Sequence, residues 1–559
     1  MAKNSKHITR RLMAVMGAVA VAVVLTASTR NDFALGRYIE VLINMMRELH
    51  VFYVDQTDPA KLMKSAADGM TSTLDPYTEY MPEEEVAEFE MMTTGKYGGV
   101  GSLIRQKGDY VRFAEPYKGC PADRAGIKIG DRIIEIDGES AKGMTVDQIS
   151  RRLKGDPGTE VRLKVARLVD DSVMNLSLTR ERISISGVPY AGWLNDSIGY
   201  IAHNDFSEGC AADLRRELMN LRQTGRLRGL VLDYRGNGGG IVQEAVEILS
   251  MFLPKGSKVL EMKGRTEDMS HIYRTDKEPI DTQLPIVVLT NSGSASAAEI
   301  VAGALQDMDR AVLMGRRTFG KGLVQSTRAV GYGDFLKVTT AKYYMPSGRC
   351  IQAIDYAKRN DDGSVDYVPD SLIREFTTRG GRKVYDGGGI MPDKRMKPEY
   401  ISSFAATLVL MGTVEDYGDE YMKKNHSKPI DVKTFSITDE DYADFVKMVM
   451  EREIPYKSES RAALEKLREA LKKERNTSLG EALNAIDKGL KDDKRSNLET
   501  FRNEIVEQIN QNIVLRYAYA EGVIANTLNN DAEVLEAVKL LANKDAYKQI
   551  VTKQDTERK

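Results

Sequence analysis

Histidine and cysteine are scarce in this chain, which has five histidines and three cysteines among 559 residues. None of the histidines stands in a metal-ligand spacing or beside a serine motif, which argues against a zinc hydrolase and against a Ser-His-Asp triad. Cys120, Cys210 and Cys350 form no Cys-x-x-Cys pair. A disulfide framework is therefore excluded, and a cysteine nucleophile lacks a recognisable partner. The sequence predicts no metal and no cofactor.

An excess of charge of one sign is also lacking. The chain has 80 basic and 82 acidic residues, a net charge of −2, which argues against nucleic acid as the main partner. Neither the dinucleotide glycine spacing nor the Gly-Lys-Ser/Thr ending of a phosphate loop is present. Apolar residues make up 42% of the chain. This content and the length predict about three or four domains with real cores.

A basic leader opens the chain. Lys3, Lys6, Arg10 and Arg11 precede an uncharged run over residues 12–28, which is typical of an export signal. The run is intermediate in length between a cleaved signal and the shortest membrane span, so a cleaved signal and a membrane anchor both stay open. Its positive flank predicts that the rest of the chain is exported. We expect a bacterial periplasm or cell envelope, with or without an inner-membrane anchor.

A serine motif follows a short apolar strand that we predict over residues 285–290. The motif, residues 291–299 with the sequence NSGSASAAE, opens an apolar helical pattern, so we expect Ser296 at a helix N-terminus. Free N–H groups and the helix dipole there can stabilise an oxyanion beside the serine hydroxyl. The alternative is a capping box, in which Ser296 and Glu299 only satisfy backbone N–H groups.

A lysine motif follows a second predicted strand over residues 311–315. The motif, residues 318–325 with the sequence TFGKGLVQ, places Lys321 between two glycines. A lysine acts as a general base only if its charged form is disfavoured, and burial among apolar groups lowers its pKa from about 10 toward about 7–8. Taken alone, a lysine such as Lys321 between glycines is usually a solvated turn residue, and a glutamine such as Gln325 usually belongs to the polar surface.

The order of these segments resembles the carboxy-terminal processing peptidases, also called tail-specific proteases. In that family the serine and the lysine lie 25 positions apart, as Ser296 and Lys321 do, and a glutamine follows four positions later, as Gln325 does. The resemblance implies that Ser296 is the nucleophile, that Lys321 is the base and that Gln325 orients the lysine. It also implies an oxyanion hole made by the N–H groups of Gly240 and Ala297.

A third segment of the family follows a predicted strand over residues 229–233. Residues 233–240, with the sequence DYRGNGGG, resemble the family's Asp-Leu-Arg-x-Asn-Pro-Gly-Gly, with Tyr234 in place of leucine and Gly238 in place of proline. The glycines permit positive φ and a close approach of backbone N–H groups to a ligand. The alternative is a strand-to-helix connection with only a structural role.

A PDZ domain is predicted from two further resemblances. Residues 97–101, with the sequence YGGVG, resemble the loop that holds a peptide's terminal carboxylate, and residues 121–138 resemble the usual PDZ turn and strand. The resemblance implies substrate binding by Tyr97, Gly98, Gly99, Val100 and Gly101. The partner is then the unstructured C-terminus of an exported protein, added as a strand to the sheet edge. Whether the domain gates the active site or only tethers substrate stays open.

From about residue 401 the sequence is charged and poor in glycine, with leucine and isoleucine recurring at spacings of three or four, which predicts amphipathic helices. These helices either pack on their own enzyme or form a homodimer arm or an adaptor surface. The resemblance implies a crotonase-like α/β protease core within a mixed multidomain chain that is helical at both ends. We expect a leader over 1–30, a helical region over 31–92, a PDZ domain over 93–185, the core over 186–400 and a helical domain over 401–559.

Together these features predict an exported endopeptidase. It would capture protein tails through its PDZ domain and cleave near them through an acyl-enzyme on Ser296. The alternative is a catalytically quiet PDZ scaffold or periplasmic chaperone on the same fold.

Overall fold

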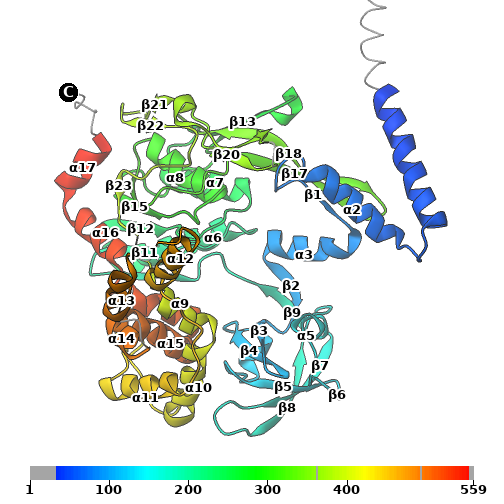
Figure 1. The fold of residues 1–559 in the computed structure, drawn as a ribbon. Coiled ribbons are helices and arrows are strands. Elements are labelled where there is room, and N and C mark those ends of the chain that lie inside the picture. Colours follow the sequence, from blue (N-terminus) through cyan, green and yellow to red (C-terminus); the bar gives the residue numbers. More distant parts are fainter. Residues whose placement is uncertain (1–32, 361–362, 399, 477, 491–493, 553–559) are drawn as a thin grey trace, which may run out of the picture. The chain divides into compact units, whose positions relative to one another are not determined.

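The computed structural model describes residues 33–360, 363–398, 400–476, 478–490 and 494–552 (Figure 1). The predicted leader and anchor, over residues 1–30, lie outside the described residues. The chain divides into two compact units: one contains the chain up to Val86 with Gln325–Thr339, and the other contains Ala87–Val324 with Thr340–Lys559. No helix in the described ranges combines the length and the apolar character that crossing a membrane requires.

A six-stranded sheet is the base of the larger unit. Its strand order is β10 (Tyr190–Trp193), β11 (Ile198–Ala202), β12 (Gly229–Asp233), β15 (Ile286–Thr290), β16 (Val312–Gly315) and β23 (Lys394–Arg395). β10 is antiparallel to β11, and the other neighbours run parallel. The four strands from β11 to β16 are buried throughout, as expected for a parallel sheet that is covered on both faces. The three strands predicted from the sequence are confirmed.

Helices from distant parts of the chain cover the two faces of this sheet. One face carries α6 (Cys210–Thr224), α7 (Val242–Phe252) and α8 (Ala297–Asp307), which share a single apolar core with the strands. The other face carries α16 (Ala532–Ala542) and α17 (Lys544–Thr552), shown in red in Figure 1. The last helices of the described chain therefore complete the protease core.

A second six-stranded sheet forms the PDZ region. Five strands follow in the order β3 (Ser102–Lys107), β4 (Tyr110–Pro116), β5 (Arg132–Ile136), β7 (Glu160–Ala166) and β8 (Val173–Thr179), with β6 (Glu139–Ser140) beside β5. Their core also contains residues of α4 (Pro121–Arg124) and α5 (Val146–Leu153). β3 is an edge strand, so one side of its backbone can pair with an added peptide. The chain enters and leaves this region through β2 (Lys96–Gly99) and β9 (Glu181–Ser184), which pair with each other.

The C-terminal helices form a core of their own. It is built by α9 (Ser403–Leu410), α10 (Thr413–Asn425), α11 (Asp439–Met450), α14 (Lys494–Thr500) and α15 (Arg502–Thr527). α12 (Glu459–Lys473) and α13 (Gly480–Gly489) form a smaller cluster. The predicted amphipathic helices are confirmed. α15 is interrupted at Ala518 and Tyr519, whose backbone angles leave the helical range.

The smaller unit contains α2 (Pro59–Thr71), β1 (Glu79–Met81) and parts of β17 (Leu323–Gly331) and β18 (Asp334–Tyr344). β1 pairs antiparallel with β18. A helix over residues 33–52 precedes α2, within the helical region expected over 31–92. The remaining elements are α3 (Glu83–Thr94), which spans the division between the units, β13 (Lys258–Gly264), β14 (His271–Arg274), β19 (Ile354–Arg359), β20 (Val365–Tyr367), β21 (Glu375–Thr377), β22 (Lys383–Tyr385) and the short 3₁₀ helices Glu267–Met269 and Asp370–Leu372.

Because α16 belongs to the protease core, shortening one of its buried side chains should destabilise that core. The Leu541 side chain is 6% exposed and packs beside Gly229 of β12. We expect Leu541→Ala to cost about 2–5 kcal/mol and to lower the unfolding temperature. Leu535→Ala on the same helix is the control, because Leu535 is 43% exposed. Equal unfolding temperatures for the two variants in scanning calorimetry would contradict this role of α16.

Candidate active site

Ser296 stands at the N-terminus of α8 in a backbone conformation that residues other than glycine rarely adopt. Its φ is 54° and its ψ is −116°, and such strain persists only where the surroundings enforce it, often at active sites. The preceding turn is fixed by Ser294, whose hydroxyl donates to the Tyr234 carbonyl at 2.8 Å and accepts from the Asn291 N–H at 2.9 Å. The turn thus holds Ser296 at the helix start predicted from the sequence.

A glycine loop, residues 234–240, lies directly against this turn. The N–H of Ala295 donates to the Asn237 carbonyl at 2.9 Å, and the Asn237 side-chain oxygen accepts from the N–H of Gly239 at 2.9 Å. Gly239 has a φ of +93°, and a Cβ atom there would lie 2.7 Å from Ser296 Cβ and 2.8 Å from the nitrogen of Ala297. Only glycine permits this approach of the loop to Ser296.

Two amides beside Ser296 remain free to bind an anion. Within the described ranges, the N–H groups of Gly240 and Ala297 donate to no protein acceptor. Ala297 is the first residue of α8, where the N–H groups and the helix dipole favour negative charge. This arrangement can stabilise an oxyanion that forms next to Ser296.

A buried carboxylate joins the two segments predicted to carry the chemistry. Glu299 of α8 is fully buried, and it accepts hydrogen bonds from the N–H groups of Ser296 and Lys321, each at 2.9 Å. It also accepts from the N–H of Gly320 at 2.8 Å and from the Thr318 hydroxyl. Burial raises the pKa of Glu299 to about 7, and the four hydrogen bonds act in the opposite direction. The glutamate half of the predicted capping box is present, but Glu299 reaches the lysine loop as well.

Tyr343 of β18 links Ser296 and Lys321 a second time, through their backbone carbonyls. Its hydroxyl hydrogen-bonds with the carbonyl oxygen of Ser296 at 3.2 Å and with that of Lys321. The backbones of Ser296 and Lys321 are therefore linked twice, through their N–H groups and through their carbonyls. These contacts hold the two backbone segments together.

The predicted carboxylate loop of the PDZ region is split between a strand and a turn. Tyr97, Gly98 and Gly99 belong to β2 and pair with β9. Val100 and Gly101 follow in the turn that leads into β3, and their N–H groups donate to no backbone carbonyl within the described residues. Backbone N–H groups in such a turn suit a terminal carboxylate.

Comparisons with known proteins show which family the chain and its domains resemble. Three family models match: Peptidase family S41 over residues 197–357, PDZ domain over 112–167, and Probable PDZ-protease, C-terminal helical domain, over 404–541. A carboxy-terminal-processing protease of Bartonella bacilliformis is 35% identical over 305 residues, which cover 54% of this chain and 70% of the relative. A probable CtpA-like serine protease of Staphylococcus aureus is 36% identical over 311 residues, which cover 55% of this chain and 61% of the relative.

The chain belongs to the carboxy-terminal processing protease family. It is a serine-type protease with a PDZ domain, a mixed α/β core and a helical C-terminal region, as the sequence predicts. The alternative of a catalytically quiet scaffold loses its support. Among solved structures, the photosystem II D1 C-terminal processing protease is 27% identical, with 64% of this chain and 87% of that chain covered and a TM-score of 0.34.

In this protease Arg235 connects the glycine loop to the C-terminal helix α16. Its Nε donates to the Asp233 carboxylate at 2.9 Å, and its terminal nitrogens lie 2.7 Å from Asp531 and 2.9 Å from Glu533. Asp233 also accepts from the Tyr200 hydroxyl at 2.8 Å. Arg235 and Glu533 stand 298 positions apart. The end of the chain therefore supplies two of the three carboxylates that fix the arginine of this loop.

His203 lies next to the glycine loop but serves as a core residue. It is fully buried, and its ring meets Phe206 and Tyr234 edge-on at centroid distances of 4.6 and 5.3 Å. Burial lowers the pKa of His203 to about 3, so the ring is neutral. Its backbone carbonyl accepts from the Asn237 side chain at 2.6 Å. Packing and support of the loop account for this histidine, and serine activation does not.

Gln325, the third predicted catalytic residue, belongs to the smaller unit. Its side-chain amide donates to the Thr339 hydroxyl at 3.1 Å. Orientation of Lys321 by Gln325 stays a prediction.

Three residues that hold the site were not recognised from the sequence. Glu299 was assigned only to a capping box, and neither Tyr343 nor Asn237 was assigned a role. A signal for Glu299 was present, because it is the only charged residue between Ser296 and Gln306. A lone carboxylate within an apolar helix requires buried partners.

Glu299→Gln removes the titrating group while preserving its shape. The ordinary pKa of this group is 4.5 and its folded value is about 7, so the folded protein binds a proton more tightly than the unfolded chain between these values. Proton binding to Glu299 therefore stabilises the folded protein. This stabilisation is fully present below about pH 4.5 and is lost as the pH rises through about 7.

We expect the free energy of unfolding of the wild type, relative to Glu299→Gln, to fall by roughly 3 kcal/mol between about pH 4 and pH 8. Denaturant unfolding across this range measures the difference. Glu420→Gln, at an exposed glutamate, is the control and should show no such trend. A constant difference between the wild type and Glu299→Gln would contradict the buried titration.

Proposed function

We propose that Ser296 and Lys321 form a Ser-Lys dyad that cleaves proteins near their C-termini. The observation that carries this proposal is the double link between the two residues, made by Glu299 through their N–H groups and by Tyr343 through their carbonyls. A nucleophile and its base need a fixed mutual geometry. The spacing and the family membership support the same pair.

The reaction follows from these positions. Ser296 Oγ attacks the scissile carbonyl carbon while its proton passes to the neutral amine of Lys321. The tetrahedral oxyanion accepts hydrogen bonds from the N–H groups of Gly240 and Ala297. Lys321 then gives its proton to the leaving amine, which breaks the peptide bond and leaves an acyl ester on Ser296. Water then attacks the ester carbonyl carbon while Lys321 takes one of its protons. The bond from that carbon to Ser296 Oγ breaks, and Lys321 returns the proton to Oγ. We propose that Gln325 orients the lysine.

The PDZ region would select the substrate. The free N–H groups of Val100 and Gly101 suit a terminal carboxylate, and the open edge of β3 suits an extended tail. An unstructured C-terminus supplies both features. The basic leader before the uncharged run over residues 12–28 supports export, so the substrates we propose are proteins of the periplasm or cell envelope.

Removing either member of the dyad should abolish turnover. We expect Ser296→Ala and Lys321→Ala each to lower kcat on an unfolded polypeptide by about 10⁴-fold or more, because each removes half of one proton-transfer pair. The double variant should resemble either single variant, and Gln325→Ala should lose less. Ser292→Ala, at an exposed serine in the same turn, is the control. Substantial turnover by Ser296→Ala would sink the assignment and direct attention to Ser294.

Tail recognition should depend on the terminal charge. We expect a C-terminally amidated tail peptide to bind about 10- to 100-fold more weakly than the free acid, because a charge-assisted hydrogen-bonded anion is lost. Fluorescence anisotropy measures the affinity. Gly101→Ala should also weaken binding, since its φ is +74° and a Cβ would lie 2.4 Å from Cys120 Cβ. Gly143→Ala is the control, with a φ of +77° and open space around the new carbon. Equal binding of acid and amide would rule out this mode.

A further inference from the structure

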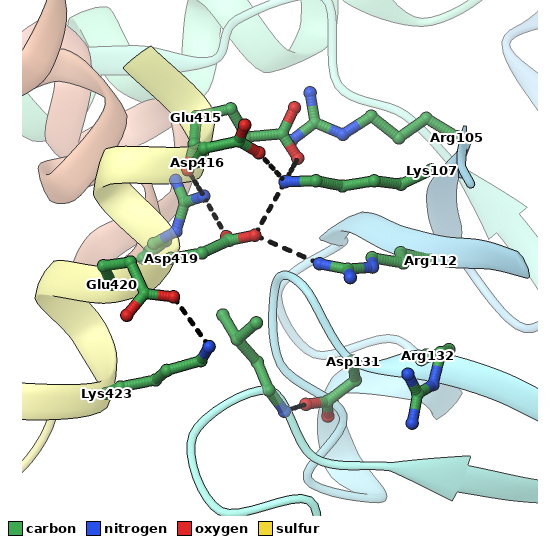
Figure 2. Close-up of polar contacts among 12 residues, drawn as sticks. Arg105, Lys107, Arg112, Asp131, Arg132, Glu415, Asp416, Asp419, Glu420 and Lys423 are labelled. Atoms are coloured by element: carbon green, nitrogen blue, oxygen red, sulfur yellow. Dashed lines mark hydrogen bonds and ion pairs between the residues drawn. The ribbon is translucent and has the colours of Figure 1, made fainter. Parts of the chain in front are cut away.

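A cluster of opposite charges joins the PDZ sheet to the C-terminal helices (Figure 2). The PDZ cations are Arg105, Lys107 and Arg112, and the α10 carboxylates are Glu415, Asp416 and Asp419. Lys107 Nζ lies 2.7 Å from Asp416, 2.8 Å from Asp419 and 3.3 Å from Glu415. Arg105 pairs with Glu415 at 2.7 Å and Arg112 with Asp419 at 3.0 Å. Each PDZ cation therefore has a carboxylate partner on α10.

The centre of this cluster is shielded from water. The side chain of Asp419 is 8% exposed, and it also pairs at 2.6 Å with Arg516 of α15, which is 2% exposed. Burial acts to raise the pKa of Asp419, but the charges and hydrogen bonds of Arg516 and Lys107 lower it below its ordinary value. Removing one partner would leave a shielded charge unpaired, which is costly. The Glu420–Lys423 pair on the same helix is half exposed and does not involve the PDZ region.

A second contact arises where α15 is interrupted. Tyr519 has a φ of 56° and a ψ of −167°, and this break releases the N–H of Ala520 from the helix. That N–H donates to the Glu115 carboxylate of the PDZ region at 2.8 Å, and the Tyr519 hydroxyl donates to Asp123 at 2.7 Å. Strained backbone of this kind is held by its surroundings. Here those surroundings include the PDZ region.

Both contacts fall on the parts of the PDZ region that would hold a peptide. Arg105 and Lys107 lie on β3, the edge strand to which a tail would add. Between Glu115 and Asp123 the chain passes through Cys120, which packs against Gly101 of the carboxylate turn. The C-terminal helices thus contact β3, beside the proposed tail, and the segment between Glu115 and Asp123, which lies behind the turn that would bind the tail's carboxylate.

The contacts described above are ion pairs and hydrogen bonds. Within the described residues, the PDZ core and the core of the C-terminal helices share no buried apolar side chain. Salt weakens the partly exposed Arg105–Glu415 pair of this contact more than the shielded pairs of Asp419. The other connection of the PDZ region is the ribbon of β2 and β9, four residues each, and a two-stranded ribbon is marginally stable alone.

We propose that the C-terminal helical domain is a clamp for the PDZ domain. The α10 carboxylates and the break in α15 fix the tail-binding strand, so that a bound tail reaches Ser296 in constant geometry. This role presupposes the tail cleavage proposed above. Fixed geometry raises the effective concentration of the tail at the site.

Lys107→Glu opens the clamp by placing a carboxylate among three others. We expect at least a tenfold rise in KM for a protein substrate with a free unstructured tail, whereas Glu420→Lys should leave the rate on a short internal peptide that does not reach the PDZ domain unchanged within about twofold. Small-angle scattering should show a larger radius of gyration. The wild type at about 1 M salt, where the Debye length falls to about 3 Å, should change in the same direction but by less, because the ion pairs of Asp419 are shielded from water. Glu420→Lys is the matched control, with a charge reversal on the same helix.

A charge exchange tests the contact itself. Arg105→Glu and Glu415→Arg should each raise KM, and the double variant should recover most of the loss because the pair is restored. If Lys107→Glu folds poorly, Lys107→Gln provides the same test without charge reversal. Scattering does not depend on Ser296, so it reports the clamp even if the dyad assignment fails. An unchanged radius and KM in Lys107→Glu would overturn the proposal, and so would faster cleavage of the protein substrate, which would make the contact inhibitory.

Discussion

The buried carboxylate of Glu299 is the contact on which the rest of the candidate site depends. Four donors from two segments converge on it, and the N–H groups of Ser296 and Lys321 are two of them. A carboxylate without water is tolerated only where hydrogen bonds replace its hydration. The lysine loop is therefore held in the one conformation that supplies those donors. The same contacts help to offset the strain of Ser296, whose φ of 54° would otherwise favour relaxation of the turn.

A second constraint is that helices from the protease segment cover only one face of the sheet, so the other face must be covered by a distant part of the chain. The strands from β11 to β16 are apolar on both faces, and α6, α7 and α8 cover only one of them. α16 and α17 cover the other, and α16 also brings Asp531 and Glu533 to Arg235. The C-terminal helices therefore close the sheet and position the glycine loop at once. This explains physically why a protease with this sheet needs the last part of its chain.

Sequence reasoning succeeded where local pattern and local structure coincide. Continuous apolar runs gave β12, β15 and β16, and leucine spacing gave the C-terminal helices. The motif spacing brought Ser296, Lys321 and the glycine loop into one hypothesis, and the structure places their backbones together. Contacts between distant segments could not be read in this way. Tyr343 and Asp531 reach the site only through the fold, and helical periodicity shows that a face is apolar without showing what covers it.

The C-terminal helical domain holds its two neighbours by different physics. Its last helices pack on the sheet through an apolar core. Separating them would expose apolar surface to water, which is unfavourable, and this packing does not depend on charge. α10 and α15 hold the PDZ region through ion pairs and hydrogen bonds. The ionic attachment to the PDZ region is therefore easier to break than the apolar attachment to the sheet. If it breaks, the PDZ region can move while the sheet stays covered. A change in PDZ position therefore need not disturb the link among Glu299, Ser296 and Lys321. In the function that we propose, tail binding can then be altered separately from cleavage.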